Sequence, residues 1–132
     1  MRIRGVVETS LYVDDVSRSK EFYQRLFGFE AMVQDERICA LNVAPGHVLL
    51  LFRKGGSTDP GSQFPTHDGD GNLHFAFAVD KSELQPWEER LAAAGVGIES
   101  RKDWPLGGRS IYFRDPDGHL GELATPGTWA NY

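Results

Sequence analysis

The sequence predicts an α+β fold made of two βαβββ repeats that together form a curved sheet lining a cleft. Three observations support this prediction. An alternating segment at residues 6–13 is followed by an amphipathic helical pattern and three short strand patterns. The same order of patterns returns after residue 72. The 132 residues also include 15 glycines and 7 prolines, a composition typical of many short elements joined by turns.

The first repeat has recognisable start and stop signals. Residues 6–13 alternate with the period of a half-buried strand, and Asp15 or Ser17 is expected to cap the helix that follows. Gly28 is expected to end that helix, because glycine readily adopts the left-handed conformation of a C-cap. The expected elements are a strand at 6–13, a helix at 18–27 and strands at 29–33, 38–43 and 47–52.

A long segment without periodicity, residues 53–71, separates the repeats. It holds five of the glycines and two of the prolines, which predicts a loop or linker. Loops of this length in compact domains are usually functional or connecting, and this one would allow a repeat to pair with a partner chain. The second repeat is then expected to have a strand at 73–79, a helix at 82–94 capped by Ser82, and strands at 96–99, 109–114 and 120–124.

The two halves match each other in sequence as well as in pattern. Residues 8–14 align with 74–80, and residues 46–51 align with 118–123. Neither half is long enough to bury both faces of its sheet alone, so we expect the two sheets to pair. The predicted organisation is one domain, 1–132, with units at about 5–53 and 72–126 joined by the linker 53–71.

Charge and cysteine content narrow the class of protein. Fourteen basic and 19 acidic residues give a net charge of -5 without a basic stripe, which argues against nucleic acids and membranes as partners. The single cysteine, Cys39, is predicted to pack in the core, and its being the only one fits a reducing compartment. We find no apolar run long enough to span a membrane and no signal-peptide pattern. The sequence therefore predicts a cytoplasmic protein with a small-molecule substrate.

Equivalent positions in the two repeats carry ionisable residues. The first strand has Glu8 in one repeat and His74 in the other, and the last strand has Leu50 and Glu122. Each residue alone would more often be structural, at a sheet edge or bonded in the core. Their matched placement instead predicts a divalent-metal site formed by Glu8, His74 and Glu122, with zinc, manganese, iron, nickel or cobalt as the ion.

At this point the chain resembles the vicinal oxygen chelate superfamily of glyoxalase, bleomycin-resistance and extradiol-dioxygenase proteins. The segments LYVDDVSRSKEFYQRLFGFE at 11–30 and GGRSIYFRDPDGHLGELATP at 107–126 carry the resemblance, which extends from Val6 to Pro126. It implies metal ligands on the first and last strands of each unit. It also implies a homodimer in which Glu8 of one chain completes the site of another.

The chain departs from the pattern of this superfamily at two of the four ligand positions. Glu8 stands where His or Gln is more usual, and Leu50 cannot coordinate an ion. Leu50 argues against glyoxalase I, which normally has a carboxylate there. Glu8 argues against ferrous ring-cleavage dioxygenases, which use two His and one carboxylate. Retention of three acidic or imidazole groups argues against the binding role of bleomycin-resistance proteins, which lack them.

Candidate substrate-contacting residues follow from the same resemblance. Tyr112 lies ten residues before Glu122, a spacing at which fosfomycin-thiol transferases carry a tyrosine that contacts substrate. As a catalytic group it would polarise or protonate a substrate oxygen. Ser10 and Lys102 also match that subfamily in their distances from the ligands. Those enzymes carry an arginine where this chain has Asn131.

Other polar residues have weaker or structural interpretations. Trp104 is placed to cover the expected cleft. Arg109 could bind an anion, but strand alternation favours a solvent-facing side chain. His67, in the linker, could act as a base, although an exposed loop histidine is the better interpretation. His47 and His119 occupy the same turn in both repeats, which favours a structural role.

The leading functional hypothesis is a divalent-metal enzyme of the lyase or isomerase type. The metal would chelate vicinal oxygens of a small substrate and stabilise an enolate or oxyanion, with Glu8 or Glu122 as the base. Three alternatives remain open. They are a ring-cleavage dioxygenase, a fosfomycin-type thiol transferase and a non-catalytic small-molecule-binding resistance protein.

Overall fold

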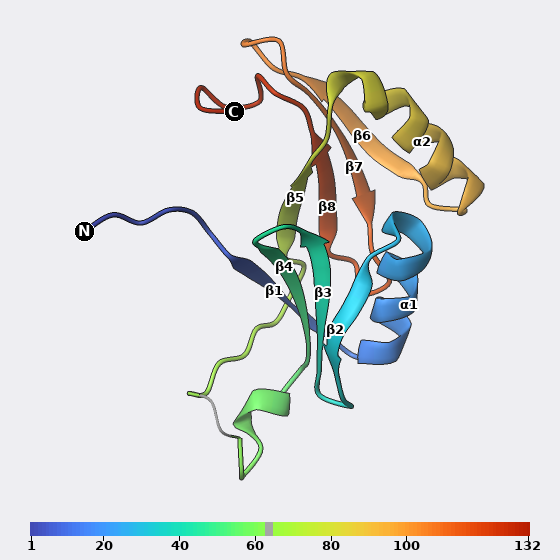
Figure 1. Ribbon diagram of the computed structural model, residues 1–132. Coiled ribbons are helices and arrows are strands. Elements are labelled where there is room, and N and C mark those ends of the chain that lie inside the picture. Colours follow the sequence, from blue (N-terminus) through green and yellow to red (C-terminus); the bar gives the residue numbers. More distant parts are fainter. Residues whose placement is uncertain (63–64) are drawn as a thin grey trace. The chain divides into compact units, whose positions relative to one another are not determined.

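A computed structural model describes residues 1–62 and 65–132 and divides the chain into two compact units (Figure 1). Unit 1 is Met1–Gly71 and unit 2 is Asn72–Tyr132. Each unit contains one four-stranded mixed sheet and one α-helix, which confirms the predicted α+β class with two βαβββ modules. No helix in the described ranges is both long and apolar enough to cross a bilayer.

Unit 1 follows the order that the sequence predicts. Its sheet is ordered β1-β4-β3-β2, with β1 parallel to β4 and the other pairs antiparallel. A short 3₁₀ turn, Gly56–Thr58, follows the last strand. The elements are β1 (Glu8–Val13), α1 (Val16–Phe27), β2 (Glu30–Gln34), β3 (Ile38–Ala44) and β4 (His47–Arg53).

Helix α1 has the expected caps. The Asp15 carboxylate accepts a hydrogen bond from the Arg18 backbone N–H at 3.0 Å, so Asp15 rather than Ser17 is the N-cap. Gly28 takes a positive φ of 75° and its N–H bonds back to the Gln24 carbonyl.

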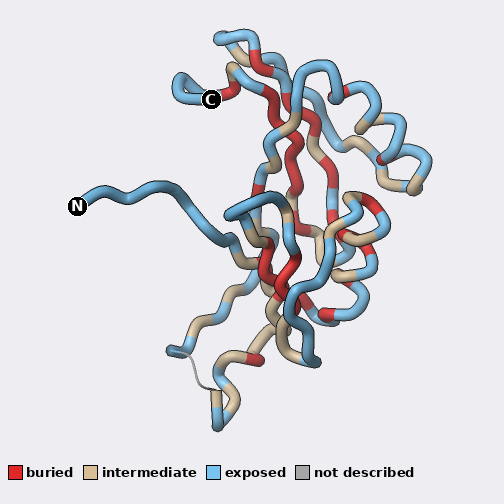
Figure 2. Tube along the Cα trace, viewed as in Figure 1, coloured by how far each residue is buried: buried red, intermediate tan, exposed pale blue. Residues whose placement is uncertain are grey.

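The core of unit 1 lies between α1 and one face of its sheet. Alternate residues of β1 and β4 are fully buried there, and the helix contributes Phe22, Tyr23 and Leu26 (Figure 2). The opposite face, here called the helix-free face of sheet 1, carries the strand residues that alternate with the buried ones. Its members on β1 and β4 are Glu8, Ser10, Tyr12, Val48, Leu50 and Phe52.

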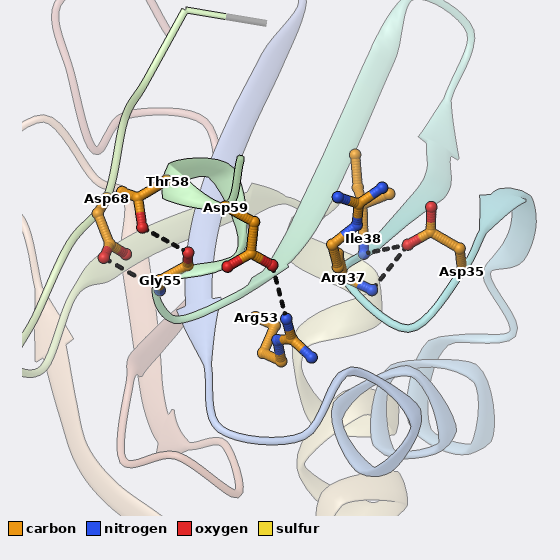
Figure 3. Close-up of polar contacts among 8 residues, drawn as sticks. All are labelled: Asp35, Arg37, Ile38, Arg53, Gly55, Thr58, Asp59 and Asp68. Atoms are coloured by element: carbon orange, nitrogen blue, oxygen red, sulfur yellow. Dashed lines mark hydrogen bonds and ion pairs between the residues drawn. The ribbon is translucent and has the colours of Figure 1, made fainter. Parts of the chain in front are cut away.

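Polar contacts order the turns of unit 1 (Figure 3). The Asp35 carboxylate accepts from the backbone N–H groups of Arg37 and Ile38, which closes the turn between β2 and β3. Arg53, the last residue of β4, pairs with Asp59 in the following segment at 3.0 Å. These contacts give the first part of the predicted linker a defined structure within unit 1.

Unit 2 repeats the topology with the sheet order β5-β8-β7-β6. Its α-helix begins at Leu84, after a 3₁₀ turn at Lys81–Glu83, and no side chain caps it, so the predicted Ser82 cap is wrong. Strand β6 runs beyond the predicted 96–99, because its polar residues pair with β7 along one edge. The elements are β5 (His74–Ala78), α2 (Leu84–Ala93), β6 (Ile98–Asp103), β7 (Arg109–Arg114) and β8 (Leu120–Ala124).

The core of unit 2 is packed around one glycine. Phe113 is fully buried, and a Cβ atom added to Gly121 would lie 2.3 Å from its Cζ. Phe75 and Leu123 are also buried in this layer, and α2 contributes Leu91. Because Gly121 has no side chain, it leaves the room that the Phe113 ring occupies.

Strand register confirms that the two modules are equivalent. Glu8 pairs with Val48 in the parallel ladder of unit 1, and His74 pairs with Leu120 in that of unit 2. Two residues further on, Ser10 pairs with Leu50 and Ala76 pairs with Glu122. Residues that align between the two repeats in sequence thus occupy equivalent positions in the two parallel ladders.

Candidate functional site

Three polar side chains meet on the sheet of unit 2. His74 is the first residue of β5, Glu122 lies in the middle of β8, and Tyr112 lies directly opposite Glu122 on β7. Because the three strands are neighbours, the fold alone brings together residues that are far apart in sequence. These are three of the predicted site residues.

The hydrogen bonds within this cluster give each atom a role. The Glu122 Oε1 atom accepts from the Tyr112 hydroxyl at 3.1 Å, and Oε2 lies 3.2 Å from His74 Nε2. The other ring nitrogen of His74, Nδ1, lies 3.0 Å from the Leu120 carbonyl oxygen. Since a carbonyl can only accept, Nδ1 carries a proton, and Nε2 is the ring nitrogen that faces the Glu122 carboxylate.

Burial differs sharply within the cluster. The Glu122 side chain is only 7% exposed, whereas the His74 side chain is 51% exposed. A buried carboxylate is costly unless partners satisfy it, and here one phenol and one imidazole do so. Burial and the nearby Glu122 charge raise the pKa of Tyr112, so the phenol stays protonated and donates to the carboxylate at neutral pH.

This donor set fits a divalent ion. A histidine that ligates a metal through one ring nitrogen usually donates its other N–H to a carbonyl or carboxylate, as His74 does to Leu120. The Glu122 carboxylate oxygen beside Nε2 supplies a second ligand of the type that zinc and manganese accept, and binding of the ion would displace any proton on Nε2.

The third predicted ligand, Glu8, lies in unit 1. It is the first residue of β1 and is exposed, on the helix-free face of sheet 1. Val6 and Val7, which precede it, are also exposed. Within residues 1–62 and 65–132, no group of three or more His, Cys, Asp or Glu side chains is placed to hold an ion. The three-ligand site therefore stays a prediction.

Trp104 and Lys102 lie near the other end of β7. The Trp104 Nε1–H donates to the Ser110 hydroxyl at 2.8 Å, and Ser110 is buried two residues before Tyr112 on the same face of the strand. The Lys102 ammonium lies 4.9 Å from the centre of the Trp104 ring. The indole of Trp104 also stacks on Trp129 with 6.3 Å between the ring centres. These contacts hold the Trp104 ring in a defined position.

Ser10 and His67 belong to unit 1. Ser10 is half-buried and faces Leu50 across the ladder, in the position that Ala76 has beside Glu122. His67 is not the exposed loop residue that the sequence favours. Its ring is half-buried against Tyr12 and Phe52. Sequence reasoning missed this contact because loop residues carry no periodicity, although the alternation of β1 placed Tyr12 on the same face as Ser10.

The remaining candidates are structural or surface residues. His119 is fully buried and its Nδ1 accepts from the Leu73 backbone N–H at 3.0 Å, while His47 is exposed. Arg109 is exposed and pairs with Asp103 at 2.8 Å. Cys39 is buried in the core of unit 1.

A surface cavity in unit 2 lies apart from the polar cluster. Its volume is about 730 Å³, and α2 and the exposed ends of β6 and β7 bound it. A bidentate ion pair between Arg101 and Glu88 crosses its wall and lowers the pKa of the Glu88 carboxyl. None of the described lining residues is His74, Tyr112 or Glu122, so we do not assign the chemistry to this cavity.

Comparisons with known proteins agree on a family. The profile of the Glyoxalase/Bleomycin resistance protein/Dioxygenase superfamily matches residues 5–123. Metallothiol transferase FosB of Bacillus licheniformis is 32% identical over 125 residues, covering 94% of this chain and 77% of that protein. Glutathione transferase FosA of Serratia marcescens is 31% identical over 121 residues, covering 92% and 80%.

Solved structures give the same result. A lactoylglutathione lyase from Agrobacterium tumefaciens superposes with a TM-score of 0.92 at 30% identity, covering 98% of this chain and 99% of that one. The fosfomycin resistance protein FosX from Listeria monocytogenes, in complex with Mn(II) and sulfate, superposes with a TM-score of 0.69 at 27% identity, covering 94% and 91%.

Proposed function

Because the chain belongs to the glyoxalase/bleomycin resistance protein/dioxygenase superfamily, we propose that it is a divalent-metal-dependent thiol transferase acting on a small oxygen-rich substrate of the fosfomycin type. Of the reactions that the sequence leaves open, thiol transfer has the best support, since curated relatives at about 30% identity are named as thiol transferases. The observation that carries the proposal is the His74–Glu122 pair, with Nδ1 of His74 held on a backbone carbonyl.

His74 Nε2 and Glu122 Oε2 are the proposed protein ligands from unit 2, and Mn²⁺ is the first ion to test, given the Mn(II) complex of FosX. When bound, such an ion would act as a Lewis acid toward a substrate oxygen. The Leu120 carbonyl fixes the tautomer and orientation of His74. The Tyr112 hydroxyl holds Oε1 of Glu122, which leaves Oε2 on the side of the imidazole.

Thiol addition to an epoxide forms one C–S bond and breaks one C–O bond. The electron pair stays on the oxygen, which takes a proton and becomes a hydroxyl, while the thiol gives up its own proton. In this proposal Tyr112, whose raised pKa keeps it protonated at neutral pH, turns its single O–H from Glu122 Oε1 to the reacting oxygen as charge develops there. Lys102 and Ser10 are the proposed contacts to the anionic part of the substrate. Asn131 offers no positive charge at the position where the family resemblance implies an arginine.

The proposal is tested by mixing the protein with Mn²⁺, glutathione and fosfomycin and following the phosphonate by ³¹P NMR. We expect a new thioether product signal from the wild type and none from Glu122→Ala. The matched control is Glu99→Gln, which changes an exposed carboxylate paired with Arg114 on the same sheet. Tight Mn²⁺ binding without any product would reject thiol transfer to fosfomycin while keeping the metal centre.

A second candidate reaction is the glyoxalase type. The observation that favours it is the superposition on the Agrobacterium lactoylglutathione lyase, with a TM-score of 0.92. Leu50 counts against it, because a carboxylate is expected at that position. Formation of S-lactoylglutathione from methylglyoxal and glutathione, followed by ultraviolet absorbance, separates the two reactions.

The third ligand and the assembly belong to the same proposal. Glu8 has the register position in β1 that His74 has in β5, and we propose that it completes the site in a cytoplasmic homodimer, supplied by a second copy of the chain. Sedimentation should show a dimer, and Glu8→Gln should weaken Mn²⁺ binding less than Glu122→Ala does. A monomer that binds one ion per chain would overturn the shared site.

A further inference from the structure

A loop of unit 1 folds onto the helix-free face of sheet 1. His67 lies against β1 and β4 at the rung where Tyr12 pairs with Phe52. Its ring stands edge-on to Phe52, with 4.6 Å between centres and 80° between planes. The Tyr12 hydroxyl lies 2.8 Å from His67 Nδ1. An imidazole is thus held on the face that also carries Ser10 and Glu8.

The loop is built to hold this imidazole. The Ser57 hydroxyl contacts both the carbonyl oxygen and the N–H of His67, which fixes the backbone on both sides of the residue. The Asp68 carboxylate accepts the backbone N–H of Gly55 at 3.0 Å (Figure 3). Its other oxygen accepts the N–H of Gly69 at 2.9 Å. Both oxygens of this neighbouring carboxylate are therefore taken up by the loop itself.

Close packing of the loop also demands a glycine. A Cβ atom added to Gly69 would lie 2.4 Å from Cδ2 of the Tyr12 ring. Such an approach between backbone and ring is open only to glycine. The Tyr12 ring is therefore covered on one side by the loop, while its hydroxyl engages His67.

The hydrogen bond to Tyr12 engages Nδ1 of the imidazole. Burial and the Asp68 charge raise the pKa of Tyr12, so the phenol keeps its proton at neutral pH. A phenol that donates to Nδ1 leaves the neutral ring with its proton on Nε2. Among the residues that the structure describes, Nε2 has no hydrogen-bond partner. Nε2 is therefore the end of the ring that is left to contact a ligand.

We propose that His67, held by Tyr12, donates its Nε2–H to an oxyanion of the substrate on the helix-free face of sheet 1. Alternate residues of a strand are roughly 6.6 Å apart, so Ser10 lies one such step from Tyr12 and one from Glu8. In this proposal the phosphonate or carboxylate lies between Ser10 and the His67 imidazole. The inference rests on the proposed function, since it assigns the anionic group of the same substrate to unit 1.

The test is a set of variants with two separate readouts. Fosfomycin affinity is measured by calorimetry with Mg²⁺ present, and the His67 ring nitrogens are followed by ¹⁵N NMR. We expect His67→Ala to weaken fosfomycin binding about tenfold, the usual cost of losing a hydrogen bond to a charged group, while divalent-metal affinity is unchanged. Tyr12→Phe should keep the ring packing but lose the fixed tautomer seen in the ¹⁵N shifts. The control is His47→Ala, at an exposed position of the same sheet.

The outcomes separate this inference from the proposed function. If His67→Ala binds fosfomycin within twofold of wild type, or if fosfomycin leaves the wild-type Nε2 signal unmoved, the inference is wrong. If Glu122→Ala binds divalent metal as well as wild type, the proposed function is wrong instead. His67→Gln, which retains an N–H donor, should recover part of the affinity, a result that loss of loop structure would not give.

Discussion

The two units share one topology and one register but fill equivalent positions with different chemistry. At the centre of the last strand, unit 1 places Leu50 opposite Ala40, whereas unit 2 places Glu122 opposite Tyr112. One rung away, unit 1 pairs Leu41 with Leu49 and unit 2 pairs Phe113 with Gly121. The strand register thus determines which positions face each other. The side chains at those positions determine whether they form an apolar contact or a polar cluster.

The same comparison shows where a buried charge is tolerated. Glu122 is buried with a phenol and an imidazole within 3.2 Å, while Leu50 has an alanine across the ladder and Ser10 on the other side. Unit 1 instead places its imidazole, His67, on the same face through a loop. Among the described residues, the imidazole of His67 in unit 1 contacts a phenol, whereas that of His74 in unit 2 lies beside a carboxylate.

The largest expected effect comes from removing that carboxylate. Glu122→Gln should lower Mn²⁺ affinity about a hundredfold or more, because an amide offers a neutral ligand in place of a charged one. Calorimetric titration of the metal measures this. Unchanged affinity would show that unit 2 is no more a metal site than unit 1.

Moving the carboxylate into unit 1 should be costly. Leu50→Glu places a charge in a nearly buried position opposite Ala40 and should reduce the free energy of unfolding by about 2–4 kcal/mol. The reciprocal control, Glu122→Leu, leaves no unpaired charge and should cost less. Urea unfolding of both variants makes the comparison. Equal losses would mean that the partners of Glu122 do not matter.

The glycine of unit 2 offers a smaller effect. Gly121→Ala should destabilise the protein by about 1–3 kcal/mol, because the new methyl group meets the Phe113 ring in a closed layer. Gly97→Ala is the control, since an added Cβ meets nothing there. A Gly121→Ala protein as stable as wild type would show that Phe113 repacks freely.

The smallest expected effect is a loss of folding stability at alkaline pH. The pKa values of Tyr12, Tyr112 and Tyr132 are raised above 10.0, mainly by burial. The folded state therefore holds these protons more tightly than the unfolded chain, so stability is full below the unfolded value and falls as pH rises through the folded values. Thermal melts between neutral and strongly alkaline pH should show this fall, reduced in Tyr112→Phe. A flat profile would contradict it.

The sequence was informative about the fold because periodicity and the repeat are local signals that the strand registers reproduce. Boundaries were less accurate. The polar strand β6 (Ile98–Asp103) carries no alternating pattern and is held by pairing with β7, which is a non-local effect. The predicted cap at Ser82 failed because a 3₁₀ turn precedes the helix and shifts its start to Leu84.

The site was predictable to the extent that it follows from strand register. The repeat placed His74 on the first strand and Glu122 on the last strand of its unit, and the observed registers make these strands neighbours and set Tyr112 opposite Glu122. The Tyr12–His67 contact could not be predicted, because a loop brings together residues whose contact depends on Ser57 and Gly69 rather than on any period. Glu8 is exposed at the start of β1, where the preceding residues Val6 and Val7 are exposed as well.

The central claim is that the imidazole of His74 and the carboxylate of Glu122 hold a divalent ion. The most direct test is anomalous diffraction at the manganese edge from crystals grown with Mn²⁺. We predict one strong peak at coordination distance from both His74 Nε2 and Glu122 Oε2, absent in the Glu122→Gln variant. No peak at this pair, or one unaffected by the substitution, would contradict the assignment of the metal centre.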